Sequence, residues 1–187
     1  MNISDVFTSI PSPEGRKDKE NRVYEFFREN NIPVYGLDHD PADTMEICEE
    51  IEGKLGADIC KNLFLCNSQA TTFYLLLMPG KKVFKTKFLS KQINSSRLSF
   101  GSAENMEKYL DITPGSVSVM GLMNDKDKCV KLLIDKDLLE LDEIGIHPCI
   151  NTSTLKISTK TLTDIIVPAL GREITIVDLP DPAKENL

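Results

Sequence analysis

The chain has 187 residues, of which 41% are hydrophobic and 27% charged, and its net charge is −7 at pH 7. This length suits one ordinary domain with its own core, and this composition is that of a globular protein rather than a disordered one. A run of about 18 apolar residues, as a membrane-spanning helix needs, is absent, and residues 1–13 do not resemble a secretory signal, so we expect a cytoplasmic protein.

Hydrophobic periodicity and turn residues divide the chain into helices and strands. In chain order we predict a lead-in at 1–15, a helix at 17–30, a strand at 34–37, a helix at 44–55, strands at 62–66 and 72–78, helices at 86–93 and 102–110, strands at 116–122 and 130–134, a short helix or turn at 135–142, a strand at 154–157, a helix at 159–170 and a strand at 173–177. The strands at 62–66 and 72–78 are expected to form a central hairpin, because only a short turn-forming stretch separates them.

The helices and strands interleave, and the chain contains no internal repeat, low-complexity tract or linker. This pattern favours a single α/β domain in which helices surround a mixed, curved β-sheet. We place the domain at residues 16–187, after the lead-in at 1–15.

Charge is distributed unevenly along the chain. Residues 59–103 contain no Asp or Glu and carry a local charge of +7, which leaves −14 on the remainder. The basic residues of this segment are Lys61, Lys81, Lys82, Lys85, Lys87, Lys91 and Arg97. A basic face of this kind is what binding to a phosphate backbone requires, although a solvated lysine-rich loop and helix would give the same pattern.

The chain contains five cysteines, Cys48, Cys60, Cys66, Cys129 and Cys149, without a C-x-x-C pair. With only two histidines to help, they make a poor zinc site, and free cysteines are commonly buried in the reduced form. The sequence also has no recognisable serine or cysteine nucleophile pattern. We therefore expect reduced thiols and no metal site.

Three segments carry a resemblance to a known family, and a fourth matches more weakly. They are Lys61-Asn62-Leu63-Phe64-Leu65, Thr113-Pro114-Gly115-Ser116-Val117-Ser118-Val119-Met120-Gly121-Leu122, His147-Pro148-Cys149-Ile150-Asn151-Thr152-Ser153-Thr154 and, more weakly, Gly171-Arg172-Glu173-Ile174-Thr175-Ile176-Val177-Asp178-Leu179. In this order and spacing they resemble the lysine-led strand, the glycine-led loop, the H-P-x-x-N-x-x-T run and the C-terminal strand of the YbaK/ProX family. That family is related to the editing domain inserted in bacterial prolyl-tRNA synthetases. Its loop usually reads G-x-x-x-P, and here Val119 replaces the proline, so the fixed φ of proline is lost.

The resemblance implies a barrel-like editing-domain fold and a trans-editing hydrolase that removes alanine from mischarged proline tRNA. Water would hydrolyse the ester directly, the ribose hydroxyl of the tRNA would assist, and no metal or organic cofactor is implied. A synthetase pocket built for proline gains only about 1–3 kcal/mol of discrimination from a missing methylene. A second, size-excluding pocket would correct the resulting errors. The implied partner is aminoacylated proline tRNA and not a membrane, and the chain could be a monomer or a weak dimer.

The resemblance also assigns residues to the site. The catalytic residues would be Lys61, holding a phosphate or the terminal adenosine, Gly115, whose loop N–H groups would polarise the ester carbonyl, and His147, which would position the aminoacyl group or the water. The substrate-binding residues would be Ser116, Val119, Met120, Gly121, Asn151 and Thr154. The tRNA-binding residues would be Lys81, Lys82, Lys85 and Lys87, which are taken from the basic segment at 59–103 and not from the matched motifs. Without the resemblance, a strand-edge lysine, a turn glycine and a hydrogen-bonded histidine would be sufficient explanations.

Two other functions fit the same residues. One is a deacylase for cysteine-charged proline tRNA, as in the YbaK branch of the family. The other is a non-catalytic module that binds charged tRNA as a sensor. The His147-Pro148 run favours alanine over cysteine, and the presence of Lys61, Gly115 and His147 argues against a sensor, while Val119 leaves the sensor open.

Overall fold

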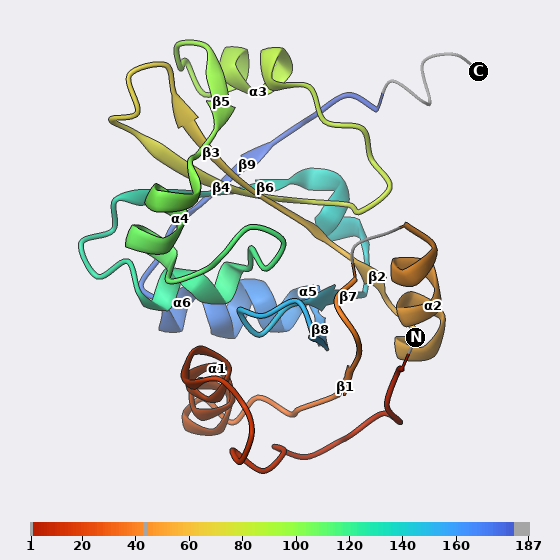
Figure 1. Cartoon of the computed structure of the whole chain (residues 1–187). Helices are drawn as coiled ribbons and strands as arrows, with labels where there is room; N and C mark the ends of the chain where they lie inside the picture. The colour runs from red at the N-terminus through yellow and green to blue at the C-terminus, as the bar shows by residue number, and fades with distance from the viewer. Residues whose placement is uncertain (1, 43–44, 182–187) are drawn as a thin grey trace.

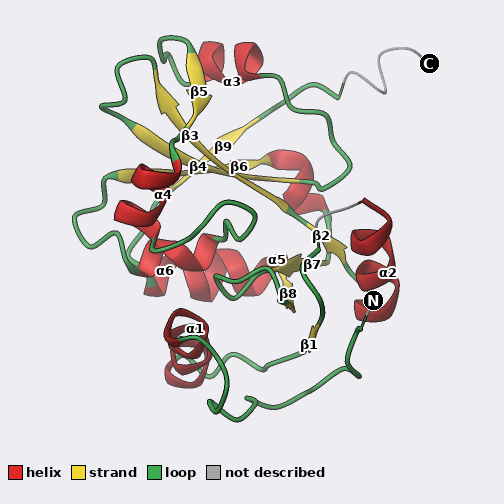
Figure 2. Ribbon diagram, in the orientation of Figure 1, coloured by secondary structure: helices red, strands yellow, loops and turns green. Residues whose placement is uncertain are grey.

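The computed structural model describes residues 2–42 and 45–181 as one α/β unit of helices and two β-sheets (Figures 1 and 2). The α-helices are α1 (Asp18–Glu29), α2 (Met45–Leu55), α3 (Thr86–Gln92), α4 (Ala103–Leu110), α5 (Thr159–Thr161) and α6 (Val167–Ala169). Two 3-10 helices, η1 (Val119–Met123) and η2 (Lys136–Glu140), and a π-helical segment, η3 (Leu162–Ile166), complete the helical elements described. The strands are β1 (Gly36–Asp38), β2 (Asp58–Ile59), β3 (Lys61–Asn67), β4 (Phe73–Met78), β5 (Leu98–Phe100), β6 (Val130–Asp135), β7 (Glu143–Ile146), β8 (Ser153–Ser158) and β9 (Ile174–Val177).

The larger sheet has five strands in the order β5-β3-β4-β6-β9. Its centre is the predicted hairpin, in which β3 and β4 pair antiparallel from Lys61 opposite Met78 to Cys66 opposite Phe73. Strands β4, β6 and β9 run parallel to one another. Every residue of β4 is buried, as is typical of a strand covered on both faces.

Successive residues of β4 alternate between two hydrophobic cores because side chains on a strand point to opposite faces. Leu75 and Leu77 lie in the main core with residues of α1, α4 and the helix at 159–169. Leu76 and Met78 lie in a second core on the other face, with Leu89 of α3. In Figure 2 the strands of this sheet accordingly lie between α3 on one side and α4 and α6 on the other.

The smaller sheet has four strands in the order β1-β8-β7-β2. Strand β2 pairs parallel with β7, and only Cys60 separates it from β3 of the larger sheet. The Cys60 main-chain N–H donates to the Gly145 oxygen at 3.0 Å. The beginning of β3 therefore lies beside the end of β7, which leads into the loop that contains His147.

The α/β class and the single domain are confirmed, but the strands form two sheets, and the order of the strands within each does not close it into a barrel. The short strands β2, β5 and β7 were not predicted. The strand predicted at 116–122 is wrong, because residues 119–123 form η1. A Cβ at Gly121 would lie 2.4 Å from Ile112 Cδ1 and 3.1 Å from Leu110 Cβ at the end of α4, so any larger residue would require these neighbours to move.

The helix predicted at 159–170 is present, but it contains the π-helical segment η3. Pro168 follows this segment and has no N–H to donate to the helical ladder. The other predicted helices agree with α1, α2, α3 and α4 to within a few residues, although Thr44, at the start of the second one, lies outside the described residues.

Candidate functional site

The glycine-led loop and the histidine-led loop, far apart in the sequence, lie against each other in the structure. Ser118 Oγ donates a hydrogen bond to the His147 main-chain oxygen at 2.5 Å. At Gly115, where φ is +88°, a Cβ would lie 3.8 Å from Asn151 Nδ2. Two of the three predicted catalytic residues therefore belong to one local cluster, formed by the loop before η1 and the loop between β7 and β8.

The ring of His147 is held in a defined orientation. Its Nδ1 lies 3.0 Å from the Ser153 main-chain oxygen, and because a carbonyl oxygen only accepts, Nδ1 carries the proton. Among the described residues, Nε2 has no hydrogen-bond partner, so its lone pair is free. Burial lowers the pKa of His147, the hydrogen bond to Ser153 opposes this, and the charge of His39 adds to the lowering. The imidazole is therefore neutral at pH 7.

A second histidine, His39, belongs to the same cluster, and the sequence did not reveal it. Its ring centroid lies 6.4 Å from that of His147. His39 Nδ1 donates to the Asp40 main-chain oxygen at 2.8 Å, so Nε2 must accept from Thr154 Oγ1 at 2.9 Å. Burial also lowers the pKa of His39, more than the hydrogen bond to Asp40 and the nearby acidic charges raise it. In the sequence, His39 was distinguished only as one of the two histidines of the chain.

Thr154, predicted to bind substrate, is fully buried, and its hydroxyl is donated to His39. Thr154 therefore supports His39 and is not an exposed residue of a pocket. Its neighbour Ser153, also fully buried, joins β8 to β1 by donating from Oγ to the Leu37 oxygen at 3.2 Å. Asn151 remains half-exposed beside Gly115.

Lys61 is half-buried at the first position of β3. Its Nζ donates to the Lys82 main-chain oxygen at 2.8 Å, and burial lowers its pKa. In the described part of the chain no hydrogen bond or ion pair joins Lys61 to Gly115 or His147. The pairing of β2 with β7 nevertheless places it near the loop that carries His147.

The predicted substrate-binding residues of η1 are not exposed. Val119 and Met120 have no accessible surface and belong to the main core, and Gly121 is buried against α4. Ser116 is also buried, and its N–H donates to the Thr113 oxygen at 3.1 Å. Val119, Met120 and Gly121 directly follow the loop at 113–118 and are packed in the interior, and Val119 and Met120 expose no surface to a substrate in this structure.

The four lysines predicted to bind tRNA differ in their surroundings. Lys82 is a correction, because its side chain is only 3% exposed and its ammonium pairs with Asp135 and Asp137 instead of facing outward. Lys81 is exposed but forms ion pairs with Glu52 and Asp58 at 3.4 and 3.1 Å.

The remaining two lysines, Lys85 and Lys87, are exposed at the start of α3. Lys87 Nζ lies 4.8 Å from the centroid of the neighbouring Phe88 ring.

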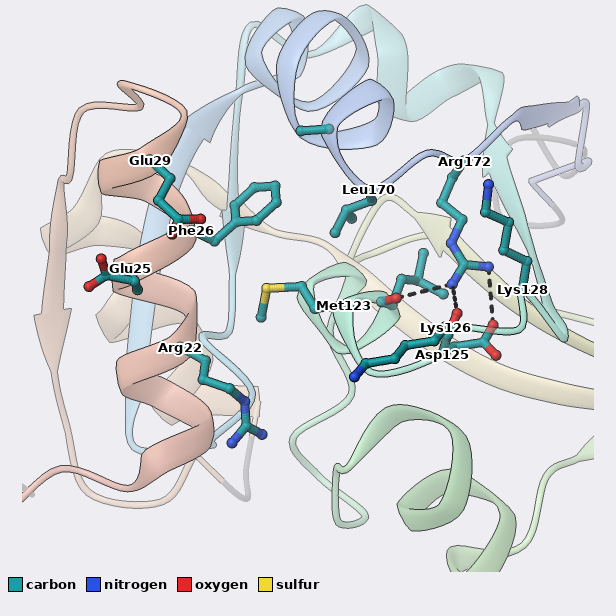
Figure 3. Close-up of a pocket in the computed structure, with 12 residues that line it drawn as sticks. Arg22, Glu25, Phe26, Glu29, Met123, Asp125, Lys126, Lys128, Leu170 and Arg172 are labelled. Carbon is teal, nitrogen blue, oxygen red and sulfur yellow. Dashed lines mark hydrogen bonds and ion pairs between the residues drawn. The ribbon is translucent and has the colours of Figure 1, made fainter.

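A cavity of about 490 Å³ lies elsewhere, between α1, the segment after η1 and the segment after α6 (Figure 3). Phe26, Met123 and Leu170 face it, and none of the predicted site residues lines it. At its edge Arg172 donates to Asp125 Oδ2 at 3.1 Å and to the Leu122 oxygen at 3.0 Å. The weak C-terminal match at Arg172 therefore corresponds to a structural anchor of the segment at 122–130.

The two most strongly buried thiols are poor nucleophiles. Burial raises the pKa of Cys60 and of Cys149 to about 12 in each case. Thiol nucleophiles act as thiolates, so Cys149 is unreactive although it lies two residues from His147. Within residues 2–42 and 45–181, no group of three or more His, Cys, Asp or Glu side chains could hold a metal ion, and no helix is long and apolar enough to cross a membrane.

The chain is similar to proteins that edit charged tRNA. The model of the aminoacyl-tRNA editing domain matches residues 39–165, a range that begins at His39 and includes Lys61, Gly115 and His147. The prolyl-tRNA editing protein ProX of Acetoanaerobium sticklandii is 34% identical over 162 residues, which cover 87% of this chain and 98% of that protein.

Two more distant proteins extend the comparison. Prolyl-tRNA synthetase associated domain-containing protein 1 of Danio rerio is 22% identical over 147 residues, covering 78% of this chain and 79% of that protein. The solved structure of a candidate trans-editing enzyme for prolyl-tRNA synthetase has a TM-score of 0.65 at 16% identity and covers 88% of this chain and 99% of that one. At this low identity, the likeness to the solved structure shows a shared fold and nothing about the site.

Proposed function

This chain belongs to the aminoacyl-tRNA editing domain family, and on that premise we propose that it is a trans-editing deacylase that removes alanine wrongly attached to proline tRNA. The 34% identity to a prolyl-tRNA editing protein over nearly the whole of both chains supports proline tRNA as the substrate. The H-P-x-x-N-x-x-T run at 147–154 supports alanine as the amino acid removed.

The observation that carries the proposal is the contact between the glycine-led and histidine-led loops. The hydrogen bond from Ser118 to the His147 oxygen brings a loop with a positive-φ glycine beside a neutral imidazole with a free Nε2. Backbone N–H groups near a glycine can approach an ester carbonyl closely, and a neutral imidazole can accept a proton. These are the two groups that ester hydrolysis by water requires.

The proposed reaction is direct hydrolysis of the aminoacyl ester. The N–H groups of the loop at Gly115 bind the carbonyl oxygen as it gains negative charge, while His147 Nε2 orients the water and takes its proton. The ribose oxygen leaves and is protonated, which gives free alanine and uncharged tRNA. The raised pKa of Cys149 supports water rather than a thiol as the nucleophile. Lys61 holds a phosphate or the terminal adenosine as a point charge and thereby fixes the ester against the loop at Gly115, so that its contact with the substrate contributes to kcat.

We propose that selection is by size and is set beneath the loop rather than on an open wall. Val119 and Met120 directly follow the loop at 113–118 and are fully buried in the main core, and their volume is proposed to set how deeply the loop lies. Packed positions tolerate little change in volume. Asn151, half-exposed beside Gly115, is proposed to contact the aminoacyl group, and Lys81, Lys85 and Lys87 are proposed to contact the tRNA backbone.

The direct test is to incubate the purified protein with proline tRNA charged with alanine, cysteine or proline and to follow the loss of the ester. The spontaneous loss without protein is subtracted from each. We expect clear hydrolysis of the alanine ester and little of the proline ester. Much faster loss of the cysteine ester would replace alanine by cysteine as the substrate. Binding of charged tRNA without hydrolysis of any ester would make the protein a sensor.

A further inference from the structure

Lys82 is unusual because it is a buried lysine with two carboxylate partners. Its side chain is 3% exposed, and its Nζ lies 2.8 Å from Asp135 Oδ2 and 2.8 Å from Asp137 Oδ2. Burial lowers its pKa, but the hydrogen bonds to the two carboxylates outweigh burial and the pKa is raised. A charged ammonium is thus held inside the protein, and such groups are kept only where they are paired.

The anchors of Lys82 are attached to rigid parts of the fold. Asp135 is the last residue of β6, between β4 and β9 in the larger sheet, and its side chain is fully buried. Its Oδ1 accepts from the Asp137 N–H at 3.2 Å, which joins it to the start of η2. The ammonium of Lys82 is therefore fixed relative to the centre of the sheet.

The main chain of Lys82 meets the proposed catalytic lysine. Its carbonyl oxygen accepts from Lys61 Nζ at 2.8 Å, and its N–H donates to the Pro79 oxygen at 3.2 Å, which closes a tight turn. The same turn is pressed against β2, because a Cβ at Gly80 would lie only 2.3 Å from the Ile59 oxygen. The turn that carries the Lys82 carbonyl and the strand that carries Lys61 are thus both held in place.

We propose that Lys82 is a positioning residue for deacylation, which acts by holding its own carbonyl where it orients the ammonium of Lys61. This inference rests on the proposed function of Lys61. An ammonium has three donors, and Lys61 uses one on the Lys82 carbonyl, while the described residues offer it no other partner. With this bond in place, the two remaining N–H donors of Lys61 are held in defined directions and are available to the substrate. This role explains why Lys82 is buried rather than exposed to tRNA, although it lies in the segment at 59–103 that contains no Asp or Glu.

The test compares Lys82→Met with Lys136→Met. Lys136 lies between the two anchoring aspartates in sequence, but its side chain is 52% exposed and pairs with Asp178 at the surface. We expect Lys82→Met to lower kcat about 10–100-fold, since small misplacements of a catalytic group have effects of this size. The KM for charged tRNA should change less than about twofold, and Lys136→Met should leave both constants unchanged. A loss confined to KM, with a flatter salt dependence, would identify Lys82 as a phosphate contact and overturn the proposal.

A double-mutant cycle separates positioning from a general loss of structure. If Lys82 acts through Lys61, then Lys82→Met adds no further loss of kcat in the Lys61→Ala background. Additive losses would overturn the proposal. Because Lys82→Met leaves a buried aspartate without its partner, Asp137→Asn provides a milder variant. Asp137 is 34% exposed, so its replacement should preserve the fold while lowering kcat in the same direction.

An NMR measurement makes the result independent of enzymatic activity. A lysine ammonium held by a hydrogen bond exchanges its protons slowly and gives an observable ¹⁵N-edited signal, which Lys61→Ala assigns. We expect the Lys61 signal in the wild type and in Lys136→Met, and its loss in Lys82→Met and Asp137→Asn. An unchanged signal in Lys82→Met would overturn the positioning role. Wild-type protein that hydrolyses no charged tRNA would overturn the proposed function instead, and the NMR signal would still decide whether Lys82 holds Lys61.

Discussion

Ser118 and His147, 29 positions apart in the sequence, are joined by a hydrogen bond of 2.5 Å from Oγ to the main-chain oxygen. Ser118 Oγ also accepts from the Met120 N–H at 3.2 Å, at the start of η1. One buried hydroxyl therefore connects the glycine-led loop, the 3-10 helix and the histidine-led loop. The relative position of the two loops depends on it.

Replacing Ser118 by alanine should weaken both the fold and the proposed activity. The change leaves the His147 oxygen and the Met120 N–H without a partner in a buried place, which costs about 1–3 kcal/mol of unfolding free energy. We expect a lower kcat for the alanine ester, measured beside denaturant unfolding. The control is Ser90→Ala, whose hydroxyl donates to the Lys87 oxygen on α3, far along the chain from both loops. A destabilised variant with wild-type kcat would show that this bond does not position the reacting groups.

Reversing the charge of Lys85 and Lys87 should weaken tRNA binding. Both side chains are exposed, and neither has an acidic partner among the described residues. We expect Lys85→Glu with Lys87→Glu to flatten the dependence of log K on log salt by about 0.7–0.9 for each phosphate that the protein no longer neutralises. Lys160→Glu, on an exposed lysine of α5, serves as the control. An unchanged salt slope would mean that these two lysines are merely solvated.

Acidification should destabilise the protein through its two histidines. The pKa values of His39 and His147 are lowered in the folded state, with burial as the largest cause. Below the ordinary histidine pKa of about 6.5 the unfolded chain binds more protons, so the free energy of unfolding falls as pH falls through that value toward the folded pKa values. Urea unfolding between pH 8 and pH 5 would measure this loss.

The matching control is the variant His39→Gln, whose unfolding free energy should depend less on pH in the same range. In the proposed mechanism protonation of His147 also removes the free Nε2 lone pair, so kcat should fall on the same acidic side. Stability that is constant from pH 8 to pH 5 in the wild type would contradict the lowered pKa values.

Removing Arg172 should be strongly destabilising. Its side chain is 5% exposed and that of Asp125 is 2% exposed, and the two form a buried ion pair. Breaking such a pair from one side costs about 3–5 kcal/mol, because the other charge is left without its partner. Arg172→Met should therefore lower the urea midpoint far more than Lys160→Met, which breaks the exposed pair of Lys160 with Asp164. Equal effects of the two changes would show that Arg172 does not anchor the segment at 122–130.

The sequence predicted most of the elements because their signals are local. The two apolar runs of β3 and β4 identified the hairpin, and the apolar faces of α1 and α2 identified those helices. The prediction failed at 116–122, where alternating residues looked like a strand. There residues 119–123 form the 3-10 helix η1, in which Gly121 packs closely against Leu110 and Ile112, a contact that local periodicity does not contain. The short strands β2, β5 and β7 gave no pattern that the sequence analysis identified, whereas β1 and β9, which are equally short, were predicted.

The sequence by itself determined the α/β class, the central hairpin and, through the resemblance, the family and the loops of Gly115 and His147. Only the tertiary structure decided which charged and titratable groups are exposed. Lys82 looked like its neighbours in a basic segment, but its partner Asp137 lies 55 positions away, and the fold brings them together in the interior. His39 had no local mark of function, yet Thr154, 115 positions away, places it beside His147. Burial and pairing depend on contacts between distant segments: the pairing of β4 with β6 brings Lys82 to Asp137, and the pairing of β1 with β8 brings His39 to Thr154, which the residues on either side do not determine.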